Sequence, residues 1–176
     1  MNIKMKQKIL FLVDDLSHDF ELYHPLYGLE WEGIETVISG SKLTHTSKFG
    51  RQIKCDITFD KVNVNEYNGI IIPGGFAPDY LRSNKNVLDI VNYMNKNKKL
   101  IASICHAAQV LITADIVRDR KLTCVKQIAV DVINAGGIYK DNPVVIDENL
   151  ITSRVPSDLP GFTNTIIKKI LNRGDE

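Results

Sequence analysis

The sequence has few cysteines, and their spacing fits neither a disulfide framework nor a zinc cluster. Three cysteines occur in 176 residues, an odd number, and no CxxC pair is present. This excludes a scaffold stapled by disulfides and a cysteine-ligated zinc site, and it favours a reducing compartment, so we expect a cytoplasmic protein. The histidines His18, His24 and His45 share no metal-ligand spacing either, so no metal and no cofactor are expected.

An excess of one charge and long apolar runs are also absent. The 22 basic and 21 acidic residues leave a formal net charge of +1, which gives no field that would attract nucleic acid or an acidic membrane surface. No apolar stretch approaches the roughly 20 residues of a membrane-spanning helix. The apolar run near the N-terminus ends at Asp14 and Asp15 without a small-residue cleavage site, so we expect a strand there rather than a signal peptide.

The chain has the composition of an ordinary globular protein, with 44% hydrophobic and 24% charged residues. Its length predicts one domain, residues 1–176. Apolar runs alternate with helical patterns, which is typical of an α/β domain with a mostly parallel sheet. Residues 40–60 are polar and predict a hairpin or an irregular excursion with an edge strand. We expect strands at 8–13, 34–39, 69–75 (ending in a glycine turn), 99–104 and 122–125, two strands within 144–153 around a turn at 147–149, and helices at 20–32, 76–82, 86–97, 127–134 and 158–172.

The stretch from Lys99 to Ile112 carries the strongest chemical signal. An isoleucine-rich run stops at Cys105, and an alanine-rich stretch of helical character follows at once. This predicts a buried strand, a sharp corner that holds the cysteine, and a helix whose free N–H groups favour thiolate over thiol. His106 is placed to hold that thiolate or to pass a proton. The alternative, a cysteine that acts as a small buried hydrophobe, suits the other two cysteines better.

Ligands bind an open α/β sheet beyond the carboxyl ends of its strands. Three loops should therefore meet: residues 14–21, residues 74–79, and the corner at Cys105. Gly74 and Gly75 are expected to turn backbone N–H groups towards a developing oxyanion, with the N–H of the residue after the cysteine as a further donor. The alternative is a plain glycine turn.

Glu21 has two interpretations. It could hydrogen-bond the cysteine sulfur, in which case it is itself protonated or its charge raises the pKa of the thiol. Alternatively, it is a glutamate near a helix N-terminus that the helix dipole favours.

Five segments in order along the chain resemble the ThiJ/PfpI family, and most closely its short PfpI branch, which is named for intracellular proteases. They are Glu21-Leu22-Tyr23-His24-Pro25, Ile72-Pro73-Gly74-Gly75-Phe76-Ala77-Pro78, Ala102-Ser103-Ile104-Cys105-His106, Ile133-Asn134-Ala135-Gly136 and Ser153-Arg154-Val155-Pro156-Ser157-Asp158-Leu159. The resemblance implies a flavodoxin-like three-layer sandwich with a nucleophile elbow at Cys105. It also implies a homodimer or hexamer with the site near a subunit interface.

The resemblance assigns roles to individual residues. Cys105 matches the nucleophile and redox-sensitive thiol, His106 the histidine of the catalytic pair, and Glu21 the glutamate that contacts the cysteine. Asp79 lies where the protease branch has an acidic residue that reaches a neighbouring subunit's histidine, but the branch usually has glutamate there. His18 and Val125 are expected pocket residues, at positions where relatives often carry an acidic residue and a tyrosine or histidine.

The function implied is a cysteine-dependent hydrolase or lyase that acts on small carbonyl compounds or peptides, as a peptidase, a glyoxalase or a protein deglycase. One alternative is a non-enzymatic redox sensor or stress chaperone with an oxidisable Cys105. A glutamine amidotransferase shares such a cysteine corner, but it needs a late His-x-Glu pair, and this chain has no histidine after His106.

Overall fold

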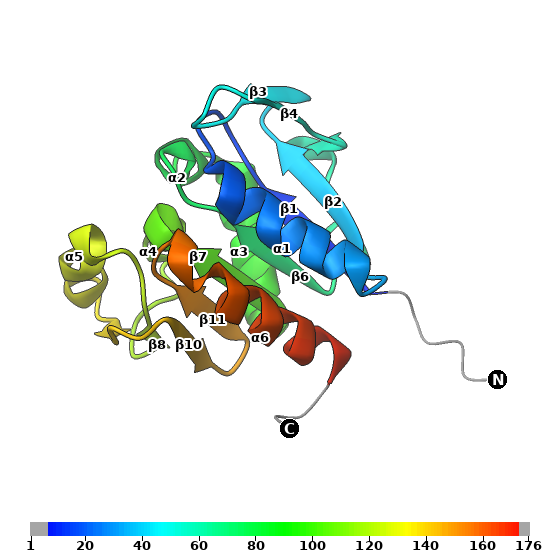
Figure 1. The fold of residues 1–176 in the computed structure, drawn as a ribbon. Coiled ribbons are helices and arrows are strands. Elements are labelled where there is room, and N and C mark those ends of the chain that lie inside the picture. The colour runs from blue at the N-terminus through cyan, green and yellow to red at the C-terminus, as the bar shows by residue number, and fades with distance from the viewer. Residues whose placement is uncertain (1–6, 173–176) are drawn as a thin grey trace.

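A seven-stranded sheet forms the centre of the computed structural model, which describes residues 7–172 (Figure 1). The strand order is β10-β11-β7-β6-β1-β2-β5, and all neighbours are parallel except the β10–β11 pair. From β1 the chain first adds β2 and β5 on one side and then β6 and β7 on the other, so the strand order reverses at β1, which is where such sheets bind ligands. The strands are β1 (Lys8–Leu12), β2 (Glu35–Gly40), β5 (Ile57–Thr58), β6 (Gly69–Ile72), β7 (Leu100–Ile104), β10 (Val144–Asp147) and β11 (Leu150–Ser153).

Helices cover both faces of the sheet and complete the three layers (Figure 1). One face packs against α1 (Asp19–Trp31) and α6 (Leu159–Leu171), and the other against α2 (Ala77–Leu81), α3 (Lys85–Lys96) and α4 (Ala108–Thr113). Side chains of β1 alternate between the two cores, with Leu10 on the α3 side and Phe11 on the α1 side. This alternation explains the continuous apolar run in its sequence, because a strand covered on both faces has no polar side.

Smaller elements surround the sheet. A hairpin of β3 (Thr44–Thr46) and β4 (Gln52–Lys54) lies beyond the end of β2, and β8 (Lys121–Leu122) pairs with β9 (Ile138–Tyr139) in a separate two-stranded sheet. The last helix before the β10–β11 hairpin is α5 (Ala129–Asn134). Single 3-10 turns are η1 (Phe59–Lys61), η2 (Val64–Glu66), η3 (Cys105–Ala107), η4 (Lys126–Ile128) and η5 (Pro156–Asp158). Within residues 7–172, no helix is long and apolar enough to cross a membrane.

The predicted α/β architecture is confirmed, and so is the hairpin with an edge strand in residues 40–60. The strand predicted at 122–125 is wrong in extent, because β8 ends at Leu122, and this strand lies outside the main sheet. Its continuation is stopped by a side chain, since the Thr123 N–H donates to Thr152 Oγ1 at 2.9 Å instead of to a neighbouring strand. The predicted helix 127–134 begins as η4 and becomes α-helical only at Ala129.

Candidate active site

The chain turns sharply at Cys105, directly after the buried strand β7. Cys105 has a φ of 61°, a left-handed conformation that is uncommon for a residue with a side chain. Such a conformation costs on the order of 1–3 kcal/mol and persists only where the surrounding structure holds it. The predicted strand, corner and helix are confirmed, although the helix begins as the single 3-10 turn η3 before α4.

Gly74 joins the glutamate of α1 to this corner. Its N–H donates to Glu21 Oε2 at 2.7 Å, and the Glu21 side chain is fully buried. A Cβ at position 74 would lie 2.6 Å from Glu21 Oε2 and 2.8 Å from the Cβ of Cys105. The absence of a side chain at Gly74 therefore lets the carboxyl group and the cysteine approach each other.

Gly75 connects the loop after β6 to the loop after β1. It has a φ of 84° and pairs with Ser17 in an antiparallel bridge, while the His18 N–H donates to the Gly74 carbonyl at 3.1 Å. A Cβ at position 75 would lie 2.3 Å from the Leu16 carbonyl oxygen, so only glycine fits. The predicted meeting of three loops beyond the sheet is thereby confirmed.

Burial dominates the electrostatics of the cysteine–glutamate pair. It raises the pKa of the Glu21 carboxyl to about 7, against the opposing hydrogen bonds from Gly74 and Cys105. Burial first, and the charge of Glu21 second, raise the pKa of the Cys105 thiol to about 12, while the N–H groups of His106 and Gly75 lower it. Glu21 Oε1 is buried without an N–H or O–H partner. The helix start alone therefore does not favour thiolate, contrary to the sequence-based expectation.

The raised pKa of the thiol would by itself exclude a thiolate at neutral pH, but a proton shared between Cys105 and Glu21 makes one available. When Glu21 is ionised, it opposes a second negative charge on Cys105, so at neutral pH the pair keeps at least one proton. Transfer of that proton from sulfur to carboxyl makes a thiolate without changing the net charge of the buried pair. Thiol acidity by itself does not distinguish the corner, because burial also raises the pKa of Cys55 and of Cys124 to about 12. The distinguishing features are the neighbouring carboxyl, the strained backbone and the facing N–H groups.

His106 stands beside the sulfur at the edge of a small cavity. Its Nδ1 lies 3.4 Å from Cys105 Sγ, and burial, followed by the charge of Lys48, lowers the pKa of the imidazole. The cavity has a volume of about 390 Å³, and its walls are Leu16, Gly75, Phe76, Asp79, Tyr80, His106 and Gln109. Asp79 thus shares a cavity with His106 within one chain.

The two other predicted pocket residues do not line this cavity. His18 is 7% exposed, its ring packs edge-on against Phe49 at 5.2 Å, and its Nδ1 is buried without a hydrogen-bond partner. Val125 is buried in the core on the α3 side, and its N–H donates to the Cys105 carbonyl at 3.4 Å. The expected oxyanion role of Gly74 also needs correction. Its N–H already donates to Glu21, so of the two glycines only Gly75 has an N–H that faces the cysteine.

Sequence reasoning missed Lys48, which lies at the mouth of the site. Its Nζ is 5.8 Å from the centre of the Phe76 ring, which belongs to the wall of the cavity, and 5.9 Å from that of Phe49. No local pattern separates this lysine from other exposed lysines of the same polar hairpin, such as Lys42 and Lys54. Only the folded arrangement brings it to the corner.

One group of potential metal ligands lies among the described residues, at the base of the hairpin. It consists of Asp14, Asp15 and His45, whose candidate ligand atoms lie within 4.8 Å of one another. These groups already have protein partners. Asp15 binds Lys42 Nζ at 2.8 Å and the Thr46 N–H at 2.9 Å, and His45 Nε2 accepts from the Lys42 N–H at 3.4 Å. The cluster fixes the hairpin to the loop after β1, and we assign no metal to it.

Comparison with known proteins gives matches over nearly the whole chain. A family model described as the DJ-1/PfpI family matches residues 7–169. A deglycase of Pyrococcus horikoshii is 41% identical and a deglycase of Pyrococcus furiosus 40% identical, each over 92% of this chain and 98% of the relative. The crystal structure of a two-domain protein of Anabaena variabilis, with DJ-1/ThiJ/PfpI-like and ferritin-like domains, matches with a TM-score of 0.91 and 38% identity. That match covers 95% of this chain and 48% of the other.

Proposed function

The chain belongs to the DJ-1/PfpI family, and from this premise we propose that it is a deglycase-type enzyme that uses the sulfur of Cys105 as its nucleophile. Two relatives at about 40% identity are named deglycases. The substrates proposed are small carbonyl compounds of the methylglyoxal type and their adducts with thiols, amines or peptides. The group that is attacked is the aldehyde-derived carbon.

The observation that carries the proposal is the position of Glu21. Its buried carboxyl has a pKa raised to about 7 by burial and contacts the thiol of a cysteine in a left-handed backbone conformation. A carboxyl that titrates near neutral pH can both take a proton from sulfur and return it to an oxygen or nitrogen of the substrate. A glutamate that served only a helix N-terminus would not need to be fully buried beside a thiol.

The chemistry follows from these neighbours. Cys105 passes its proton to Glu21, and the thiolate forms a C–S bond with the aldehyde carbon while the carbonyl electrons move to oxygen. The N–H groups of Gly75 and His106 stabilise that oxyanion. With an adduct, the reacting carbon is already tetrahedral, so its C–S or C–N bond first breaks, the hydroxyl oxygen re-forms the carbonyl, and the amine or thiol leaves with the hydroxyl proton before the thiolate adds. A proton then moves from the former aldehyde carbon to the adjacent carbonyl carbon, with His106 as the carrier, and water releases the 2-hydroxy acid and restores the thiol.

The test uses pure protein with the hemithioacetal of methylglyoxal and N-acetylcysteine, with free methylglyoxal, and with a fluorogenic peptide in a separate reaction. We expect lactate formation from the first two substrates by the wild type and none above background by Cys105→Ala. Peptide cleavage alone would favour the peptidase alternative. Equal rates for the wild type and the variant on all three substrates would overturn a cysteine-dependent enzyme.

Assembly as a homodimer or hexamer stays a prediction, and Asp79 is the residue that connects it to activity. Because Asp79 lines the cavity of His106 in its own chain, we propose that it supports the site without help from a neighbour. Sedimentation velocity combined with activity over a dilution series tests this. Activity per subunit that stays constant through dissociation supports it, and activity that falls with dissociation contradicts it.

A further inference from the structure

The backbone of Lys48 is held beside the catalytic corner by a hydrogen bond. Its N–H donates to the Ser17 carbonyl at 2.9 Å, and Ser17 in turn pairs with Gly75, whose N–H faces the cysteine sulfur. The side chain is exposed, but its ammonium is held between two aromatic rings, 5.9 Å from the centre of Phe49 and 5.8 Å from that of Phe76. Contacts of this kind favour a cation in that position.

This ammonium has no anionic partner among residues 7–172. No carboxylate of those residues lies within 4 Å of Lys48 Nζ, whereas Lys42 on the same hairpin binds Asp15 at 2.8 Å. An ammonium carries three N–H donors, and aromatic rings provide no oxygen acceptor for them. The mouth of the site therefore presents a positive charge whose hydrogen-bonding capacity is unused.

The charge of Lys48 reaches the groups around the sulfur. Burial lowers the pKa of His106 and of His18 most, and the charge of Lys48 is the next cause that lowers them. In Glu21, burial raises the pKa, and the charge of Lys48 is one of the influences that lower it. Three groups of the corner thus lie within the field of one exposed lysine. A single uncompensated charge at a partly enclosed site attracts oppositely charged ligands.

We propose that Lys48 is the anion-binding residue of this site, and that it receives a carboxylate carried by the carbonyl substrate. The site then prefers carbonyl compounds and adducts that bear a carboxylate near the reacting carbon over neutral analogues of the same shape. The substrate preference rests on the proposed function, whereas the attraction of anions to the sulfur does not. The two can therefore be tested separately.

The first test measures the field at the sulfur without any turnover. Iodoacetate and iodoacetamide both form a C–S bond with Cys105 and release iodide, and they differ in one negative charge. Mass spectrometry gives the two alkylation rates at Cys105, and their ratio cancels any change in thiolate population. We expect Lys48→Met to lower the iodoacetate-to-iodoacetamide ratio about fivefold, the size of an exposed charge interaction. Lys48→Arg should keep the ratio.

Lys54→Met is the matched control, because Lys54 is an exposed lysine on strand β4 of the same hairpin. Its ratio should equal that of the wild type, and high salt should bring the wild-type ratio towards that of Lys48→Met. An unchanged ratio in Lys48→Met, or an equal fall in Lys54→Met, would overturn the proposal.

The second test asks whether substrates use this charge. The methylglyoxal hemithioacetals of N-acetylcysteine and of N-acetylcysteine amide differ only in a carboxylate against a carboxamide. We expect the wild type to have a lower KM for the acid than for the amide, and Lys48→Met to bring the two KM values together. The comparison within each variant does not depend on its kcat. A preference that survives in Lys48→Met contradicts the substrate part of the proposal. Absence of turnover of both adducts by the wild type would instead count against the proposed function.

Discussion

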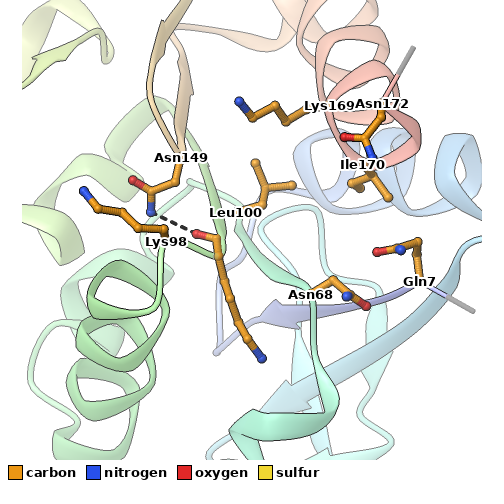
Figure 2. A pocket seen from close by; sticks show the side chains of 9 residues that line it. Gln7, Asn68, Lys98, Leu100, Asn149, Lys169, Ile170 and Asn172 are labelled. Atoms are coloured by element: carbon orange, nitrogen blue, oxygen red, sulfur yellow. Dashed lines mark hydrogen bonds between the residues drawn. The ribbon is translucent and has the colours of Figure 1, made fainter. Parts of the chain in front are cut away.

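The parallel strands all begin at one side of the sheet, here called the amino edge, and end at the opposite side, the carboxyl edge. Cavities of similar size but different polar surroundings lie at these two edges. At the amino edge, a cavity of about 320 Å³ is lined mostly by polar side chains (Figure 2), and several of these have hydrogen-bond or ion-pair partners in the protein. Lys98 binds Glu148 at 2.7 Å, Lys99 Nζ donates to the Tyr67 carbonyl at 2.6 Å, and the Asn149 amide donates to the Lys99 carbonyl at 2.9 Å.

At the carboxyl edge, by contrast, polar atoms are buried without partners. Glu21 Oε1 and His18 Nδ1 lie in this state, and the backbone is held in left-handed conformations at Cys105 and at Gly75. Buried polar atoms are usually paired. Left-handed backbone occurs at both edges, because Lys98 has a φ of 54° and Glu148 a φ of 52° at the amino edge. The comparison teaches that buried polar atoms without partners mark the functional edge of this molecule, whereas cavity volume and backbone conformation do not.

The largest expected difference between the edges is in activity. Cys105→Ala removes the nucleophile and should lower kcat/KM on methylglyoxal adducts by at least about a thousandfold, because no other group at the corner can form the covalent intermediate. Lys98→Ala, at the other cavity, should leave kcat/KM within about twofold of the wild type. Steady-state lactate formation measures both. Comparable losses in the two variants would remove the distinction between the edges.

The next difference is in how stability depends on pH. The folded state raises the pKa of Glu21 from 4.5 to about 7, mainly through burial, so the unfolded chain releases this proton first. The free energy of unfolding should therefore fall as pH rises from about 4.5 to 7, by up to roughly 3 kcal/mol, and Glu21→Gln should lack this fall. Urea denaturation at several pH values measures it.

Glu148 at the amino edge supplies the control for that experiment. Its pKa is lowered, first by the hydrogen bond from Lys98, so its effect on stability is present at higher pH and is lost on acidification. Glu148→Gln should keep the wild-type fall between about pH 4.5 and 7. If Glu21→Gln shows the same fall as the wild type, the buried carboxyl does not titrate as described.

A smaller difference concerns backbone strain. Gly75→Ala places a Cβ 2.3 Å from the Leu16 carbonyl oxygen at a φ of 84°, and it should lower the free energy of unfolding by about 2–3 kcal/mol and abolish activity. Gly161→Ala in α6 meets only a Val144 methyl at 3.6 Å and should be neutral or stabilising by up to about 1 kcal/mol. Thermal denaturation compares them, and equal effects would show that position 75 is not constrained.

The smallest expected effect is that of the exposed ion pair at the amino edge. Lys98 and Glu148 are 68% and 62% exposed in their side chains, and ion pairs so exposed contribute little to stability. Lys98→Ala should therefore leave the denaturation midpoint close to that of the wild type, and salt should remove any remaining difference. A midpoint shifted as far as that of Gly75→Ala would contradict this.

The local features of the site could be predicted from the sequence. The corner at Cys105 follows from an apolar run that stops before a helical pattern, and the meeting of the loops after β1 and β6 at this corner follows from parallel strands whose carboxyl ends share one edge. Local pattern and strand order suffice for such inferences, because they do not depend on distant packing. The contact of Glu21 with Cys105 was implied only by the family resemblance.

Properties that depend on packing could not be predicted. The direction of the thiol pKa was expected from the helix start, whereas burial and the charge of Glu21 decide it in the folded protein. Lys48 belongs to a polar hairpin with no motif, and its position at the corner depends on the bridge between Ser17 and Gly75. Strand β8 was predicted too long because the Thr123 N–H finds a side chain rather than a strand.

The most direct test of the account is the pH dependence of Cys105 alkylation by iodoacetamide, followed by mass spectrometry between about pH 5 and 10 with Cys55 and Cys124 as internal references. If sulfur and Glu21 share a proton, the wild-type rate has an inflection near the carboxyl pKa of about 7, and Glu21→Gln loses that inflection. A wild-type rate without an inflection below about pH 9, or the same inflection in Glu21→Gln, would contradict the shared proton on which the proposed chemistry depends.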